Sequence, residues 1–583
     1  MSKRILLAVL LCSAIFFIHV FFVAPHLQRG EREREGPRRE LEPPPLAGKE
    51  APLVAAEKPS FEQPAETETP IRPDIVMETP LLSLTFTNRG AALKEVVLKG
   101  PAYLAPGGKG ELHLLHPFVE DEYSLTLEDR EGKYDLAHLP YEVVSQTEKE
   151  LVFRLALKEG LVIEKEFHLE TDSYAIGVKV NFSNKGAEDK KMLLRLRGPA
   201  GISSEQPAES GGRDVKAFAA QGKPEFALRF SRADLARISG EKLLAEVTEP
   251  FLMVGVENQY FAAVLSSMPN ELAQAALAIP IVDENALAAH VAGSPVLFEK
   301  EKLKLRKMFT KSVAAAVDFK PIQLASGSSA SAEFRFFIGP KKRSILAQFP
   351  GHEQLLNYGW LSPLCVLLLW IVNAFYRIIP NYGVGILLLT GMIRVLMHPL
   401  ARKSQSSMQK MQKMRPKILE LQEKHKKNPE RLREEQMKLM REHGTSPFGG
   451  CLVPMAIQFP VFLAMYRILS VSIEMRQAPF FWWIRDLSQP DVILNLPFAI
   501  PFLGTSHLSL LPILMTVVMV IQQVGAPKPD DPQAQAQAKM MYFMPVFFGF
   551  ILYRFASGLN LYWLLSSLIG IFEQRLIRKS LAQ

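Results

Sequence analysis

The chain has 583 residues, a formal net charge of +8 and a hydrophobic fraction of 48%. This composition excludes a disordered chain, and the length allows two to four domains. Apolar residues gather at the N-terminus and in the last third, which argues against a purely cytosolic enzyme. Three cysteines, Cys12, Cys365 and Cys451, each lie in an apolar stretch, so we expect buried thiols and no disulfide framework.

Residues 1–27 are predicted to form an uncleaved signal anchor. The stretch 5–24 is apolar except for His19, and a helix of that length matches a hydrocarbon core of ~30 Å. A cleaved signal peptide is the alternative, but no small-residue cleavage site follows promptly. Residues 28–75 are rich in Pro, Glu and Arg, which predicts a disordered tether.

Residues 76–345 are predicted to form a large antiparallel β-sandwich. Apolar and polar residues alternate with period two, as in 82–87, 151–155 and 176–182, and Asn/Gly turn signals separate the segments. Because Lys3 and Arg4 hold the start of the anchor in the cytoplasm, this domain is expected on the opposite side of the membrane.

Apolar blocks dominate the remainder of the chain. They cover 361–379, 383–400, 448–470, 508–523, 540–554 and 560–577. The first contains Asn373 and Arg377, so 355–380 is expected to be an amphipathic helix at the interface, although a span remains the alternative. The sequence then predicts five spans within 381–583 and six with the anchor.

Charge orients these spans. Between Leu400 and Pro447 there are 13 Lys/Arg and 6 Asp/Glu, whereas 471–507 contains 2 basic and 3 acidic residues. The positive-inside rule places 401–446 and both termini in the cytoplasm, and the aromatic run 480–483 at the outer interface. We therefore predict a multi-pass membrane protein with a large domain exported to the side opposite the cytoplasm.

The segment 401–446 is predicted to be a cytoplasmic helical hairpin. Apolar residues at heptad spacing mark its first helix, and Asn428-Pro429 is a cap signal that opens a second helix at 429–443. Met408, Met411 and Met414 either pack the hairpin or form a pliable surface for apolar nascent segments. The basic exterior suits anionic lipid or ribosomal RNA.

Arg394 lies inside a predicted span, where an arginine costs about 2.5–3.5 kcal/mol on insertion scales. Thr390, Arg394 and His398 are spaced by four and share one helix face. Snorkelling of Arg394 to the cytoplasmic interface is the alternative. We identify no acidic residue in the core of any span to pair with it, and so predict a water-filled cavity.

Polar residues on other spans favour a shared hydrophilic groove, although each stripe alone is also typical of helix packing. These residues are Gln458; Ser509, Thr516 and Gln523; and Asn560, Trp563, Ser567, Gly570 and Gln574. The expected lack of acids disfavours proton-coupled transport.

No phosphate-binding loop, HExxH motif or metal-ligand cluster is present in the sequence. We therefore expect no enzyme activity, no cofactor, no metal and no catalytic residue. Two alternatives to a groove-based function stay open: a solute transporter or channel with a periplasmic binding domain, and a membrane-anchored periplasmic binding or carbohydrate-active domain.

Several stretches resemble the YidC/Oxa/Alb family of membrane protein insertases, in its Gram-negative form with a large periplasmic domain. They are 391–400, 447–451, 458–462, 476–480, 483–488, 543–545 and 557–563. The resemblance covers the whole architecture and is dense from about residue 380 to 578.

This resemblance implies a multi-pass protein of the cell inner membrane, with a five-helix insertase core and a periplasmic β-supersandwich. It implies that Arg394 attracts polar or acidic parts of a client in a hydrophilic groove, and that Thr390, Tyr562 and Trp563 line the groove or contact the client. It further implies nascent membrane proteins as clients, which are inserted alone or with the Sec translocon (SecYEG, SecDF), and a possible link to the ribosome or signal recognition particle through the basic loops.

Overall fold

The computed structural model describes residues 69–583 except 101–102, 107, 109, 206–214, 221–225, 232–245, 248–251, 268–271, 284, 288–309, 426–427, 443–451, 499, 501–502, 504, 525–542 and 583. The predicted anchor at 1–27, the tether up to residue 68, Cys12 and Cys451 lie outside the described residues. The chain divides into two compact units, Ser60–Val518 with Phe550–Gln583, and Met1–Pro59 with Met519–Gly549.

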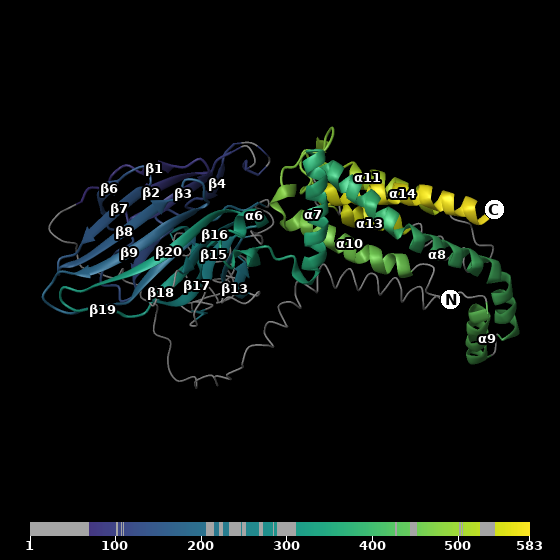
Figure 1. Ribbon diagram of the computed structural model, residues 1–583, viewed down its shortest axis with the longest axis horizontal. Helices are drawn as coiled ribbons and strands as arrows, with labels where there is room; N and C mark the ends of the chain where they lie inside the picture. The colour runs from purple at the N-terminus through teal and green to yellow at the C-terminus, as the bar shows by residue number, and fades with distance from the viewer. Residues whose placement is uncertain are drawn as a thin grey trace, which may run out of the picture. The chain divides into compact units, whose positions relative to one another are not determined.

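The first part of the larger unit consists of antiparallel sheets, seen in purple to teal in Figure 1. Among the described residues, the largest sheet has nine strands in the order β13 (Phe226–Ser231), β12 (Lys216–Ala220), β15 (Met253–Glu257), β16 (Phe261–Ser267), β20 (Ser329–Pro340), β9 (Ala175–Asn184), β8 (Leu161–Leu169), β7 (Glu150–Ala156) and β6 (Glu142–Gln146).

Smaller sheets complete this region. A four-stranded sheet contains β1 (Ile75–Glu78), β2 (Leu82–Thr87), β3 (Ala92–Leu98) and β4 (Leu112–Leu115). A five-stranded sheet contains β14 (Glu246–Val247), β17 (Ala273–Val282), β18 (Thr310–Phe319), β11 (Leu194–Ala200) and β5 (Thr126–Asp129). The strands β10 (Lys190–Met192) and β19 (Ile322–Leu324) pair separately.

Both smaller sheets pack against one face of the nine-stranded sheet. Phe167 of β8 stacks on Phe86 of β2 at 4.8 Å between ring centroids, and Phe182 of β9 contacts Phe319 of β18 at 6.1 Å. Phe167 and Phe182 lie on the same face, because directly paired residues such as Phe167 and Val178 share a face and β9 alternates with period two. The predicted β-sandwich is confirmed.

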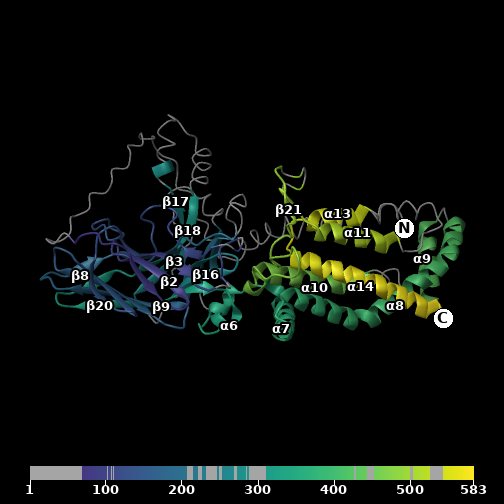
Figure 2. The same ribbon diagram turned by 90° about the horizontal axis from the view of Figure 1, so that it is seen from above.

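Helices form the rest of the described chain. They are α6 (Arg343–Leu346), η3 (His352–Leu355), η4 (Gly359–Leu361), α7 (Ser362–Ile378), α8 (Tyr382–Lys424), α9 (Pro429–Glu442), α10 (Leu452–Val471), η5 (Ile473–Met475), α11 (Leu511–Val524), α13 (Phe543–Leu552) and α14 (Ser557–Ala582). A short hairpin pairs β21 (Leu494–Asn495) with β22 (His507–Leu508). In both views α14 lies beside α8 and α10 (Figures 1 and 2).

The helix α8 is continuous over 43 residues, with Pro399 and Pro416 inside it. The predicted span and the first helix of the predicted hairpin are therefore one continuous helix, which bends towards α9 (Figure 1). At 1.5 Å per residue its contour length is about 65 Å, roughly twice the hydrocarbon thickness of a bilayer. The second hairpin helix begins as predicted, since Asn428 Oδ1 accepts a hydrogen bond from the backbone N–H of Arg431 at 3.3 Å.

Two helical segments of the described chain are long and apolar enough to cross a bilayer, Gly359–Ile378 and Tyr382–Met411. Large apolar side chains on α8 and α14 point outward, with Val395 exposed by 73%, Leu396 by 70% and Phe572 by 63%. Such outward apolar faces are typical of helices whose solvent is lipid. By contrast, α7 runs across the direction of α8 and α14 (Figure 1).

One lysine of the sandwich is fully buried. Lys165 of β8 is 0% exposed, and its Nζ donates to the carbonyl oxygens of Gly90 at 2.8 Å, Ala91 at 3.2 Å and Leu125 at 2.6 Å. These three residues have positive φ angles of 68°, 46° and 66°. The strained backbone at Ala91 and Leu125 thus helps to aim three acceptors at the three donors of one ammonium.

We expect Lys165→Met to destabilise the β domain by about 2–4 kcal/mol, because three buried carbonyls lose their donor. Thermal unfolding of the full-length protein, followed by circular dichroism of the β domain, measures this loss. The control is Lys158→Met, which removes an exposed lysine and should leave the melting temperature unchanged. Equal melting temperatures for both variants would contradict this role of Lys165.

Burial also lowers the pKa of Lys165 to about 7, against about 10.4 in an unfolded chain. Between these values the unfolded chain holds a proton that the folded chain has released, so stability rises with pH. We therefore expect the melting temperature of the wild type to increase relative to Lys165→Met as the pH is raised from about 7 to about 10. Identical pH slopes in the two proteins would refute the assignment.

A buried ion pair joins the sandwich to the loop that follows α10. Arg476 Nε lies 2.7 Å from Glu205 Oε2, and the two side chains are 2% and 4% exposed. Arg476 Nη2 also donates to the carbonyl oxygen of Leu104 at 2.7 Å, and Gln477 Nε2 donates to that of Ala105 at 2.8 Å. Arg476 and Gln477, from the stretch 476–480 that resembles the family, therefore contact the β domain.

We expect Arg476→Met and Glu205→Gln each to lower stability by about 3–5 kcal/mol, because each leaves a buried polar or charged partner behind. The double variant should lose clearly less than the sum of the single losses. A thermal double-mutant cycle on the full-length protein measures the coupling, and additive losses would contradict the pairing.

Candidate functional site

The side chain of Arg394 is directed at α14. Its Nε and Nη2 donate to Ser566 Oγ at 3.0 and 2.5 Å, and its Nη1 lies 3.8 Å from Glu573 Oε2. The side chain is 26% exposed. The side chain therefore contacts a neighbouring helix. Snorkelling would require it to extend along α8 into bulk solvent, and it does not do so.

The expectation that no acidic residue pairs with Arg394 is wrong. Glu573 of α14 is 9% exposed, and its Oε1 lies 2.8 Å from Nδ1 of His398. This carboxylate thus lies between two basic groups on α8. Glu573 falls inside the apolar block 560–577 and was therefore visible in the sequence. It lies only two residues before Arg575, the first basic residue at the end of the chain, which made it look like part of the polar terminus.

The face of α14 that meets Arg394 differs from the predicted one. Ser566 and Glu573 are seven residues apart, and Tyr562 lies four residues before Ser566, so the three share a face. The predicted stripe through Trp563 and Ser567 is displaced by one residue, a rotation of about 100°. Sequence reasoning therefore missed Ser566 and Glu573, although the heptad spacing between them was visible.

Gln458 and Tyr562, both predicted, do meet. Gln458 Nε2 of α10 donates to the Tyr562 hydroxyl at 2.7 Å, and Tyr562 is 1% exposed. Trp563 packs edge-on against Phe462 of α10 at 5.1 Å between ring centroids. Tyr562 and Trp563 thus connect α14 to α10.

Other predicted groove residues have local roles. Asn560 is 0% exposed, and its Nδ2 donates to the carbonyl oxygens of Leu552 at 3.2 Å and Phe555 at 3.4 Å, which fixes the turn before α14. The Thr390 hydroxyl donates to the Ile386 carbonyl of its own helix at 2.6 Å and is buried. In the described structure both side chains are buried and donate to backbone carbonyls.

The remaining predicted residues are also dispersed. Thr516 bonds the backbone of its own helix at Pro512 O, 2.8 Å away, and Ser509 is fully buried before α11 with its N–H donating to Tyr553 Oη at 3.0 Å. Ser567 is buried on α14. Gln523 lies on the part of α11 that belongs to the other compact unit.

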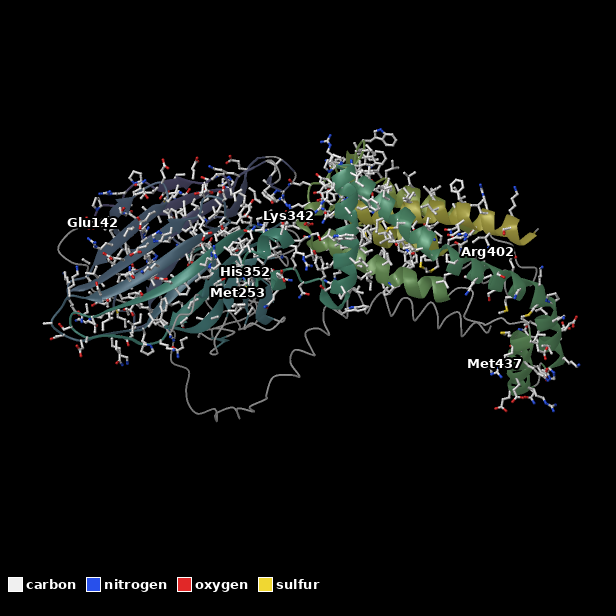
Figure 3. All side chains as sticks on the ribbon, in the orientation of Figure 1. Glu142, Met253, Lys342, His352, Arg402 and Met437 are labelled. Atoms are coloured by element: carbon white, nitrogen blue, oxygen red, sulfur yellow. The ribbon has the colours of Figure 1, made fainter. Side chains whose placement is uncertain are left out.

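Some methionines of the hairpin are buried, as packing of the hairpin requires, and others are exposed, as a surface for apolar nascent segments requires. Met414 is 3% exposed and packs inside, Met411 is half-buried, and Met408 is 42% exposed. Met437 of α9, labelled in Figure 3, is 52% exposed. Met408 and Met437 are therefore the two exposed large methionines of these helices, whereas Met414 belongs to the packing.

A basic hollow of about 640 Å³ opens on α8 beyond Arg394. It is lined by His398, Pro399, Arg402, Lys403, Ser406, Ser407 and Lys410. Arg402, labelled in Figure 3, also reaches Ser580 of α14 at 3.5 Å. Within the part of the chain that the structure describes, no group of three or more His, Cys, Asp or Glu could hold a metal ion.

A β-sandwich followed by apolar helices with an enclosed arginine defines a membrane protein with a large domain outside the bilayer. The description "YidC periplasmic domain" matches residues 74–371, and "60Kd inner membrane protein" matches residues 374–583. The chain belongs to the YidC family of membrane protein insertases, which are inner-membrane proteins with a periplasmic domain.

Full-length relatives agree with this assignment. The membrane protein insertase YidC of Pelobacter propionicus is 31% identical and covers 99% of both chains. That of Geotalea uraniireducens is 30% identical and covers 100% of both. The crystal structure of an active YidC insertase aligns with 86% of this chain and 93% of its own at 18% identity, with a TM-score of 0.34.

Proposed function

We propose that the chain inserts membrane proteins, and that the polar groups between α8 and α14 receive the hydrophilic part of the client. The observation that carries the proposal is Arg394, whose guanidinium faces Ser566 and Glu573 while its neighbours Val395 and Leu396 are exposed apolar residues. A polar site thus lies directly beside a surface suited to lipid.

The mechanism requires no covalent chemistry. A translocated polar segment that enters hydrocarbon alone loses its hydrogen bonds to water, at several kcal/mol for each unsatisfied group. Arg394 offers that segment a charged donor where the low dielectric strengthens the attraction. The client's apolar helix then moves into lipid, with burial contributing about 25 cal/mol per Å².

The relatives support insertion and not solute transport, since they are named membrane protein insertases. The sequence argument against proton-coupled transport relied on missing acids, and Glu573 removes that argument. The insertase function therefore rests on the family and on the arginine site. The relatives' names likewise describe no enzyme.

We further propose five spans in 381–583 and one in 1–27, with both termini in the cytoplasm. The excess of basic residues between Leu400 and Pro447 supports this orientation. The helix α7 lies at the periplasmic interface, which agrees with its course across α8 and with exposed Trp360 and Trp370.

For partners beyond nascent membrane proteins, the basic hollow on α8 suggests the anionic headgroups of the cytoplasmic leaflet. Arg402, Lys403 and Lys410 line it, and Ser406 and Ser407 add hydroxyl donors suited to a phosphate. The basic hairpin is also suited to the ribosome or signal recognition particle by phosphate contacts. The Sec translocon (SecYEG, SecDF) remains a proposed partner from the family resemblance alone.

We expect Arg394→Ala to slow insertion of clients with acidic translocated segments by about tenfold, which corresponds to about 1.4 kcal/mol, and of neutral clients much less. Arg394→Lys should retain part of the activity, because the charge persists while the fork of donors to Ser566 is lost. Insertion into liposomes by the purified full-length protein measures these rates.

Lys413→Ala is the matched control, since it removes an exposed positive charge from the same helix. It should insert both clients at rates within about twofold of the wild type. If Arg394→Ala and the wild type insert acidic and neutral clients equally well, a required charge at this site is refuted.

A further inference from the structure

The guanidinium of Arg394 already faces a carboxylate of the chain itself. Glu573 Oε2 lies 3.8 Å from Arg394 Nη1, beyond hydrogen-bond distance, whereas Arg394 donates its hydrogen bonds to the neutral hydroxyl of Ser566. The attraction between Arg394 and Glu573 is therefore that of two separated charges. Nη1 makes no hydrogen bond to the described part of the chain, so its donors are free for another acceptor.

Glu573 is held independently of Arg394. Its other oxygen, Oε1, lies 2.8 Å from Nδ1 of His398, one turn further along α8. The side chain of Glu573 is 10% exposed, while those of Arg394 and His398 are 26% and 48% exposed. The carboxylate is thus the most enclosed member of the three, and its contact with His398 does not involve Arg394.

We propose that Glu573 is a resident competing anion for Arg394. Glu573 interacts electrostatically with Arg394 until a client carboxylate takes its place, and the interaction forms again when the client leaves. This inference rests on the proposed function of Arg394. A client acid must compete with Glu573 for the same positive charge, so its capture is weaker than an unpaired arginine would give. Weak capture favours release, because a client that binds tightly to the groove cannot move on into lipid.

Glu573 thereby sets the preference of the site for acidic over neutral clients, and it does so through Arg394. It is a positioning residue, and its effect depends on the charge of the client. A carboxylate that only holds α14 against α8 would act alike on all clients. This difference separates the two roles experimentally.

The test uses full-length protein in vesicles of phosphatidylethanolamine and phosphatidylglycerol, with a photoreactive residue in place of Gln458. Two single-span clients differ only by Asp or Asn at one position of the translocated tail. The readout is the ratio of Asp-client to Asn-client crosslinks. We expect Glu573→Gln to raise this ratio at least about threefold over the wild type, because an uncompensated guanidinium attracts the client acid more strongly.

Two further variants define the mechanism. Arg394→Ala/Glu573→Gln should show the same ratio as Arg394→Ala, because Glu573 acts only through the arginine. Glu420→Gln, which removes an exposed acid from α8, should keep the wild-type ratio. An unchanged ratio in folded Glu573→Gln, or a gain that persists without Arg394, would overturn the inference.

If Glu573→Gln melts below the assay temperature, Glu573→Asp keeps the charge on a shorter side chain. The shorter side chain places the carboxylate farther from Arg394. The ratio of Asp-client to Asn-client crosslinks should therefore exceed that of the wild type, and an equal or lower ratio overturns the inference. Failure of the proposed function gives a different pattern: wild type and Arg394→Ala would then show the same ratio. If the crosslink ratio depends on Arg394 but does not change in the Glu573 variants, the role of Glu573 as a resident anion is refuted, and the proposed function of Arg394 is not.

Discussion

A guanidinium that cannot lose its charge must find partners wherever the bilayer excludes water, and this constraint organises the helical part of the molecule. Arg394 can be placed within an apolar helix because α14 presents Ser566 and Glu573, two turns apart on one face, to its guanidinium. The helix pair is therefore fixed by a polar contact inside a surface that is otherwise apolar. The position that we propose for the client's polar segment is also a position where the two helices contact each other.

The β domain also encloses a basic side chain, but the hydrogen-bond partners of that side chain are of a different kind. Lys165 is 0% exposed, and its Nζ donates to three backbone carbonyls; among the described residues no acidic side chain hydrogen-bonds to it. Backbone acceptors thus satisfy Lys165 within the fold. Arg394 is partly exposed, and its Nη1 makes no hydrogen bond to the described residues. This contrast separates a buried structural lysine from an arginine available for binding.

Much of the architecture was predictable because it depends on local periodicity and on charge counts. The alternation of apolar and polar residues in β8 and β9 identified these strands, and the long apolar blocks identified helices. The contacts of the individual polar residues proposed for the groove were harder to predict. Thr390 and Thr516 satisfy their hydroxyls within their own helices, and Asn560 holds a turn, so polar residues at regular spacing did not all face one cavity.

The sequence by itself determined the strands, the apolar helices and the unusual arginine, because each is a property of one segment. Only the tertiary structure decided which faces meet: Arg394 and Ser566 are 172 residues apart, and Arg476 and Glu205 are 271 apart. The spacing of polar residues predicts which face of a helix points inward, but only to within one residue. On α14 an error of one residue corresponds to a rotation of about 100° around the helix axis. The pairing of Glu573 with Arg394 follows from that rotation, which depends on how whole helices pack.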